Sequence, residues 1–234
     1  MNESSDMAPH AFEPPCAWMN GEERLMGAVL ACRFFGLLFR AAPGKTLLRS
    51  LRDQGLLTNW PLAGGGAQAE RGLGLMRGFL CLPVEEAVSL TQREFAELFV
   101  GPEQPLNQWE SVWTSREKLL FGESTLAVRE AYACYGMETP GPEPDDHISL
   151  EMTFLGELLG RAAEASGQGD AAGAAELIAA CAAFYATHPA RWAKLFLREL
   201  EARAATDFYR GAAMLCAATL DSLEGSLFRP RGQG

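Results

Sequence analysis

Apolar residues recur every three or four positions along most of this chain, which is the spacing of amphipathic α-helices. In residues 22–39, for example, Leu25, Val29 and Cys32 fall on one helical face. The same spacing returns in further segments, which are separated by glycine, proline and polar residues. The pattern predicts helices over residues 22–39, 45–53, 68–79, 83–99, 124–135, 171–187 and 207–228, one that contains residues 148–159, and one that starts at residues 188–189.

Residues at the predicted helix ends supply start and stop signals. Ser124 is a candidate N-cap, because its hydroxyl can accept a hydrogen bond from a free amide of the first turn. Asp145 or Asp146 is expected to cap the next long helix in the same way. Gly136 is expected to end the helix before them, since glycine readily adopts the left-handed conformation that follows a helix C-terminus.

The helix that starts at Pro189 has its proline in the first turn, where the missing amide hydrogen is not needed. Its apolar spacing predicts an inward face made of Trp192, Leu195, Phe196 and Leu200. The alanine-rich segment before it and the long segment after it are helical by the same criterion.

Two stretches interrupt the helical pattern, over residues 101–114 and 140–146. The first is predicted to contain no regular helix, yet it holds Trp109 and Trp113, which is unusual for a purely solvated connection. The second has three prolines in seven residues and is also predicted to be irregular.

Composition supports the helical prediction. The chain has 36 alanines and 32 leucines among its 234 residues, whereas valine and isoleucine together number 8. Alanine and leucine favour helices and β-branched residues favour sheets, so we expect an all-α protein. We expect a single globular domain of about 8–11 helices over residues 21–228, with a flexible arm at 1–20, a frayed tail at 229–234 and a hinge candidate at 136–146.

The formal net charge is −10, from 30 acidic and 20 basic side chains. The sequence has no basic stripe of the kind that binds phosphate backbones, so nucleic acid is not an expected partner. An acidic field attracts basic peptides, although the same charge also serves simply to keep a protein in solution.

No segment predicts membrane insertion or secretion. The most apolar stretch, residues 26–39, is too short to span a bilayer and contains Arg33. Residues 1–10 include Glu3 and Asp6 and lack the apolar core of a signal peptide, so we expect a cytoplasmic protein. The six cysteines are widely spaced, which is typical of reduced, mostly buried thiols rather than of disulfides or a zinc site.

Few residues offer catalytic or metal-binding chemistry. No serine has the context of a nucleophile elbow and no cysteine that of a thiol enzyme, so no catalytic residue is predicted. On pattern alone, Asp146 and His147 favour a helix cap with a half-buried histidine. The alternative is a metal-dependent enzyme on an all-α scaffold, with ligands drawn from Asp145, Asp146, His147, Glu151 and His188, although three adjacent residues do not share one helix face.

Two motifs give the sequence a specific resemblance. Residues 98–132 read LFVGPEQPLNQWESVWTSREKLLFGESTLAVREAY, and residues 143–147 read Glu-Pro-Asp-Asp-His. In this order they resemble the TorD/DmsD family of cytoplasmic redox-enzyme maturation chaperones, and the DmsD branch most closely. A weaker match comprises Phe184-Tyr185, His188-Pro189 and Trp192, and the resemblance extends over residues 22–225.

The resemblance implies an all-helical chaperone that binds the twin-arginine signal peptide of a molybdopterin-containing redox enzyme of the DMSO reductase type. Such a chaperone holds its client in the cytoplasm until the cofactor is inserted, then releases it to the twin-arginine translocon. It is not an enzyme, and no cofactor of its own is expected. Carried over position by position, the peptide-binding residues are Phe95, Leu98, Phe99, Trp109, Trp113, Gly122, Asp146 and His147.

The chemistry of such a peptide fits this part of the sequence. Two guanidinium groups followed by an apolar segment need carboxylates and exposed aromatic surface. Glu143, Asp145, Asp146 and Glu151 are expected to form an acidic cluster beside His147, which adds Glu143 and Asp145 to the peptide site. Each aromatic residue, taken singly, is equally consistent with core packing.

The sequence also departs from the family's pattern. Asn107-Gln108 replace two prolines, Glu110 replaces a glycine, and Glu103 stands where some relatives have an aromatic residue. The two glutamates add negative charge where an arginine pair can dock. The alternative function is that of a sibling chaperone that binds the mature body of a different molybdoenzyme, and the protein is expected to be a monomer or a domain-swapped dimer.

Overall fold

The computed structural model describes residues 21–62, 66–101, 104–139, 141 and 143–228. In these segments there are ten α-helices and two π-helical turns, and the single strand-like pairing is an isolated bridge between Trp109 and His147. The all-α prediction is confirmed. No helix in the described segments is both long and apolar enough to cross a membrane. The predicted arm at 1–20, the tail at 229–234 and Glu103 lie outside the described residues.

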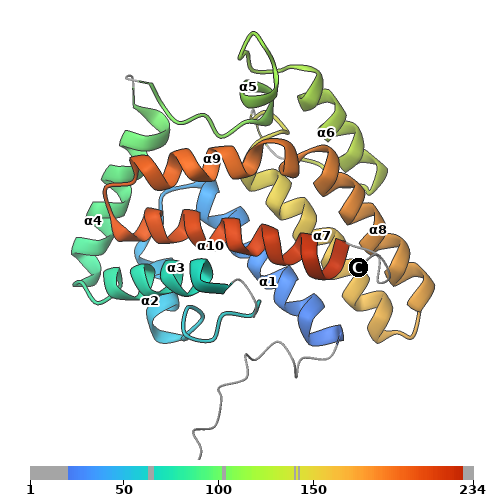
Figure 1. Ribbon diagram of the computed structural model, residues 1–234, viewed down its shortest axis with the longest axis horizontal. Coiled ribbons are helices and arrows are strands. Elements are labelled where there is room, and N and C mark those ends of the chain that lie inside the picture. Colours follow the sequence, from blue (N-terminus) through green and yellow to red (C-terminus); the bar gives the residue numbers. More distant parts are fainter. Residues whose placement is uncertain (1–20, 63–65, 102–103, 140, 142, 229–234) are drawn as a thin grey trace, which may run out of the picture.

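Figure 1 shows the helices in chain order. They are α1 (Gly21–Arg40), α2 (Lys45–Asp53), α3 (Gly66–Phe79), α4 (Val84–Phe95), the π-helical turn η2 (Ala96–Val100), α5 (Glu110–Thr114), α6 (Glu123–Cys134), α7 (Ile148–Gly167), α8 (Ala171–Thr187), α9 (Pro189–Arg203), α10 (Asp207–Leu223) and the π-helical turn η3 (Glu224–Phe228).

Helices α1 and α7 form the most extensive pair and pack tightly because glycines face the partner helix. A Cβ atom added to Gly36 of α1 would lie 2.5 Å from the Thr153 hydroxyl of α7, and one added to Gly156 would lie 3.0 Å from the Arg33 side chain. The first distance leaves no room for a methyl group, and the second requires the Arg33 side chain to move. The small residues in these two helices therefore bring their backbones together at the centre of the fold.

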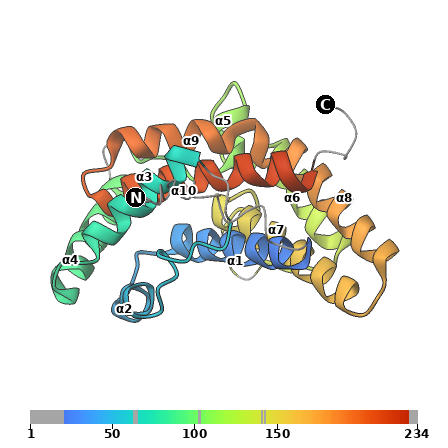
Figure 2. The ribbon, with the colours of Figure 1, turned by 60° about the horizontal axis from the view of Figure 1, so that its bottom comes forward.

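Helix α10 packs in the same way on α3, which is distant from it in the sequence (Figure 1). A Cβ on Gly72 would lie 2.7 Å from the carbonyl oxygen of Gly211, and a Cβ on Gly211 would lie 2.6 Å from that of Gly72. Each glycine thus faces the backbone of the other helix. In Figure 2, α9 and α10 form a layer that covers α1 and α7.

Most of the predicted helices are confirmed, two of them over the predicted residues, 45–53 and 171–187. One loop prediction and one prediction of a buried helix face are wrong. Residues 101–114 are not wholly irregular, since α5 forms at their end, where contacts with the loop before α7 hold its amides. Leu195 does not point inward: it is 44% exposed, whereas its predicted companions Trp192, Phe196 and Leu200 are buried.

The described cysteines form no disulfide. Cys32, Cys181 and Cys216 are buried, and burial raises the pKa of the Cys32 thiol to about 12. Cys81 and Cys134 are exposed, so burial holds for three of these five thiols. Cys16 lies outside the described residues.

The contact between Gly72 and Gly211 predicts that Gly72→Ala destabilises the protein by roughly 1–3 kcal/mol, because the new methyl group meets backbone that cannot move without shifting α10. Gly74→Ala is the matched control on the same helix, since a Cβ there meets nothing within 4 Å. We expect it to raise the free energy of unfolding by about 0.5–1 kcal/mol. Urea denaturation of both variants measures the difference, and equal effects would contradict the packing argument.

Candidate functional site

The two irregular stretches predicted from the sequence meet at a short antiparallel bridge. The amide of Glu110 donates to the carbonyl of Asp146 (2.9 Å), and the amide of Ile148 donates to that of Gln108 (2.8 Å). The rings of Trp109 and His147 make an edge contact, with centroids 5.4 Å apart. Parts of the chain almost forty residues apart in the sequence thus form one centre.

Asp146 joins α5 and α6 at this centre. Its carboxylate is fully buried and accepts one hydrogen bond from the amide of Ser111 (2.7 Å) and one from the hydroxyl of Thr125 (2.9 Å). The carboxylate therefore satisfies an amide in the first turn of α5, which explains why that helix forms. Asp146 does not cap α7, so the prediction of an aspartate cap there is wrong.

His147 is the N-cap of α7 instead. Its Nδ1 accepts a hydrogen bond from the amide of Ser149 (3.1 Å) and lies 2.7 Å from the Ser149 hydroxyl. The residue is only 4% exposed, rather than half-buried as predicted. Burial, and secondarily the positive charge of Arg40, lower the pKa of His147 to about 3, so its ring is neutral near pH 7.

Asp145 fixes the same loop from the other side. Its carboxylate accepts hydrogen bonds from Nε of Arg129 (2.6 Å) and from the hydroxyl of Thr139. Its carbonyl accepts one from the phenol of Tyr132 (3.1 Å), which is buried in α6. The predicted hinge at 136–146 stays a prediction, and in this structure Asp145 ties that stretch to α6.

Helix α6 begins two residues earlier than it would with Ser124 as its N-cap. Its N-cap is Gly122, and Ser124 makes no cap hydrogen bond, so this prediction is wrong. A Cβ added to Gly122 would lie 3.4 Å from the Cβ of Ser111. The start of α6 therefore lies in ordinary contact range of α5, where Asp146 connects the two helices.

The predicted aromatic residues form a row of rings along α9. Phe95 and Phe99 are in edge contact, with centroids 4.9 Å apart. Phe99 and Trp113 both contact Phe196 of α9, each with its ring centroid 6.4 Å from that of Phe196. Leu98 and Phe99 are buried, whereas Phe95 and Trp113 are half-buried. The row thus belongs partly to the core.

The predicted acidic cluster is mostly internal. Asp145, Asp146 and Glu151 are buried and all accept hydrogen bonds from within the protein, while Glu143 is half-buried. Buried carboxylates with internal donors hold a structure together and are not free acceptors for an incoming peptide. Of the ten predicted site residues, those with accessible side chains or backbone are Phe95, Trp109, Trp113, Gly122 and Glu143.

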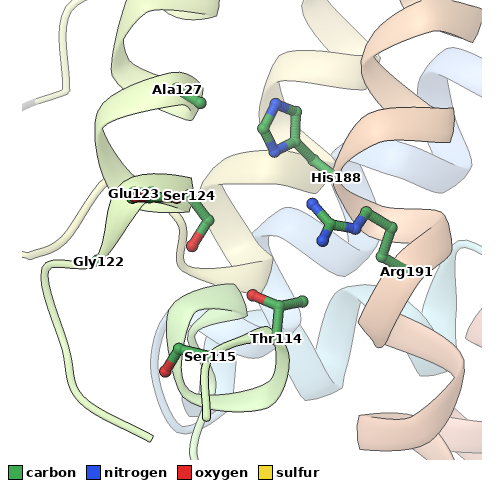
Figure 3. A pocket seen from close by; sticks show the side chains of 8 residues that line it. All are labelled: Thr114, Ser115, Gly122, Glu123, Ser124, Ala127, His188 and Arg191. Atoms are coloured by element: carbon green, nitrogen blue, oxygen red, sulfur yellow. The ribbon is translucent and has the colours of Figure 1, made fainter. Parts of the chain in front are cut away.

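A cavity of about 360 Å³ lies beside this centre, between α5, the first turn of α6 and the first turn of α9 (Figure 3). Glu123 and Ser124 line the wall formed by α6, and His188 and Arg191 line the opposite wall. Hydroxyl groups, one carboxylate and two basic side chains thus surround the space. Its complete lining is Thr114, Ser115, Gly122, Glu123, Ser124, Ala127, His188 and Arg191.

The structure also places an exposed apolar group next to the cavity that the sequence reasoning did not single out. Leu119, Leu120, Phe121 and Leu126 are 61, 41, 65 and 57% exposed. We call these four residues the apolar edge. Three of them are consecutive in the connection between α5 and α6, and this run of large apolar residues in a non-helical segment is the signal that could have identified them.

The candidate metal ligands do not come together as a metal centre. Across the described segments, no group of three or more His, Cys, Asp or Glu side chains is placed to hold an ion. His188 bonds Glu110 and His147 bonds Ser149. These side chains therefore have structural partners in this fold.

Comparison with known proteins places this geometry in context. A family model described as the nitrate reductase delta subunit matches residues 70–198. A Tat proofreading chaperone DmsD from Salmonella paratyphi A is 29% identical over 210 residues, which are 86% of this chain and 91% of that protein. A probable Tat proofreading chaperone DmsD from Haemophilus influenzae is 31% identical over 137 residues, which are 57% of this chain and 60% of that protein.

Among solved structures, a protein from Archaeoglobus fulgidus assigned to redox enzyme maturation is similar with a TM-score of 0.46 and 18% identity. The similarity covers 85% of this chain and 94% of that one.

The lowered pKa of His147 predicts a loss of stability in acid. The unfolded chain has a histidine pKa near 6.5 and the folded protein about 3, so the unfolded state binds more protons between these values. Stability is therefore complete above pH 6.5 and falls by up to about 1.4 kcal/mol per pH unit as the pH drops towards 3. In His147→Asn the amide oxygen can still cap α7, but the side chain does not titrate. The free energy of unfolding of this variant should therefore fall less in acid than that of the wild type. Denaturation curves over this range measure both proteins, and parallel profiles would contradict the assignment.

Proposed function

This chain belongs to the TorD/DmsD family of redox-enzyme maturation chaperones, and from that premise we propose that it binds a twin-arginine signal peptide at the apolar edge and the adjoining cavity. As a maturation chaperone it is not an enzyme. Its client in this proposal is a molybdopterin-containing redox enzyme, held in the cytoplasm until cofactor insertion and then passed to the translocon.

The exposed apolar edge is the observation that carries the proposal. Leaving large apolar side chains in water costs free energy that burial against a partner would recover. Four such residues lie together here, in the motif that follows Trp113, whereas most other large apolar side chains of the described chain are buried or half-buried. An apolar patch next to a polar cavity suits a peptide whose basic residues precede an apolar segment.

The backbone at this edge is strained. Lys118 and Phe121 have φ values of +51° and +63°, in the left-handed region that side chains with a Cβ seldom adopt. Holding a bulky residue there costs roughly 1–2 kcal/mol. The Phe121 ring stays exposed in spite of this cost, which fits a role in recognition better than one in packing.

Carboxylates border the apolar edge on both sides. Glu117, Glu123 and Glu130 are exposed and have no hydrogen-bond or ion-pair partner within the described part of the chain. Arg116 and Lys118 flank Glu117 and Arg129 precedes Glu130, so the individual carboxylates rather than the net local charge would attract a peptide. A guanidinium group forms two parallel hydrogen bonds with one carboxylate, which an ammonium group cannot do.

The ten site residues predicted from the sequence have two roles in this proposal. Gly122 lines the cavity, and Trp109 and Trp113 offer accessible surface at and within α5. Glu143 lies in the loop before α7, and Phe95 lies at the far end of the aromatic row. The buried residues hold the two loops in place and so act through them. These are Leu98, Phe99, Asp145, Asp146 and His147.

The sibling function within the family remains the alternative, in which the mature body of the client is the ligand. An exposed apolar edge also suits a partly folded protein surface. Titration with the leader peptide alone and with the mature client alone separates the two functions.

Calorimetric titration with a twin-arginine leader from a molybdoenzyme of the same genome should give saturable binding. Phe121→Ser should weaken it about tenfold or more, because an aromatic contact is lost. Leu30→Ser on α1 is the control, since Leu30 is 49% exposed and belongs to another element. Equal affinity of the wild type and Phe121→Ser would move the site away from the apolar edge.

A leader with two lysines in place of the arginines should bind more weakly, because the bidentate geometry is lost. Glu123→Gln should lower the affinity for the arginine leader more than for the lysine leader, and the affinity should fall as salt is added. The readout is a dissociation constant for each pair of protein and peptide. Equal dissociation constants for the arginine and lysine leaders would show that the protein recognises the apolar segment alone.

A further inference from the structure

A glutamate on α5 is buried at a position where the family's motif has a glycine. Glu110 is fully buried, and one carboxylate oxygen, Oε2, accepts the Nδ1 hydrogen of His188 at 2.8 Å. The other oxygen, Oε1, lies 3.7 Å from the Arg191 guanidinium and makes no hydrogen bond to a donor. The contact with His188 ties α5 to the start of α9.

A second buried glutamate lies on α7 and contacts the same turn of α9. Glu151 is also fully buried, and its Oε2 accepts the indole N–H of Trp192 at 3.1 Å. Its Oε1, like that of Glu110, has no donor among the described residues. Both carboxyl groups are held at the first turn of α9, because their partners His188 and Trp192 are four residues apart, and the charge of Glu110 acts on Glu151. A hydrogen bond between the two carboxyl groups needs a proton, which two carboxylates lack.

We propose that Glu110 and Glu151 share one proton, held by Glu151 and donated to Glu110, and that this shared proton positions α5 against α7 and α9. One proton accounts for both oxygens that lack a donor. It also removes one of two like charges that would otherwise be buried in contact. With the proton on Glu151, Glu110 remains a carboxylate and His188 donates to it.

The groups around the pair come from three parts of the fold, which are the loop before α7, α6 and the start of α9. Asp146, in the loop before α7, adds a negative charge, and Tyr132 of α6 is a neutral phenol whose pKa is raised well above its ordinary value by burial. His188 and Arg191 approach from α9, and the Arg191 side chain is 56% exposed. Burial first, and then the charge of Glu110, raise the pKa of Glu151 well above its usual range, although the Trp192 hydrogen bond opposes this.

Loss of the shared proton would release α5. Its backbone would keep the bonds to Asp146, but the charges of Glu110 and Glu151 would then repel each other. Since Trp113 is part of α5 and Trp109 immediately precedes it, the pair also controls the loop of the peptide site. That last step rests on the proposed function, whereas the shared proton does not.

Glu151→Gln tests the proton directly, because its amide can donate to Glu110 and accept from Trp192 without titrating. Above the ordinary glutamate pKa, the wild-type protein loses the shared proton when it unfolds, whereas Glu151→Gln has no such proton to lose. The ratio of the wild-type unfolding constant to that of Glu151→Gln should therefore rise about tenfold per pH unit. Denaturation between about pH 5.5 and 7.5 measures this ratio. The control is Glu164→Gln, an exposed residue of the same helix, whose ratio to wild type should stay flat. A flat ratio for Glu151→Gln would overturn the proposal.

Positioning is tested by rescue. Hydrogen exchange at α5 amides should be faster in Glu151→Ala than in wild type and close to wild type in Glu151→Gln. A carbonyl stretch of a protonated carboxylic acid should appear in the infrared spectrum of the wild type and disappear in Glu151→Gln. Equal exchange in both variants, or no such band, would overturn the proposal. Both readouts need no peptide, so failure of peptide binding alone would contradict the proposed function and leave the shared proton standing.

Discussion

The buried carboxylate of Asp146 is the interaction on which the arrangement of the two loops depends. It accepts from the backbone of α5 and from a side chain of α6, while the backbone of the same residue pairs with Glu110. A carboxylate removed from water requires such donors, and the short helix α5 requires an acceptor at its first turn. The carboxylate of Asp146 and the first-turn amide of α5 satisfy each other's hydrogen-bonding requirement. The two loops, α5 and α6 are therefore linked in one structural unit.

Around this unit, several acidic side chains are buried and several large apolar side chains are exposed, which is the reverse of the usual distribution. The acidic residues of the motif lie inside as connections between elements, whereas leucines and a phenylalanine of the neighbouring motif lie on the outside. A rigid polar framework that supports an exposed apolar segment keeps that segment from collapsing onto the core. The neutral state of His147 and the internal partners of Asp145 make this framework stable near neutral pH.

The helices could be predicted from the sequence because apolar spacing is a local property, and positions such as Leu25, Val29 and Cys32 are indeed buried. Features that depend on residues far along the chain could not. Helix α5 exists because of a carboxylate 35 residues away, and Glu110 is buried because His188 meets it from 78 residues away. The resemblance identified Asp146 and His147, but their burial is evident only from the three-dimensional structure. The exposure of Phe121 follows from a backbone conformation that no spacing rule anticipates.

The glycine contact between α3 and α10 also has a consequence for synthesis on the ribosome. Gly72 leaves the ribosome long before Gly211, so the face of α3 that α10 covers has no partner during most of translation. The early helices cannot complete their packing until α10 has been made. A protein of this family, which attends to the maturation of others, thus depends on its own last long helix to finish folding, and truncation before α10 would leave the apolar side of α3 open to aggregation.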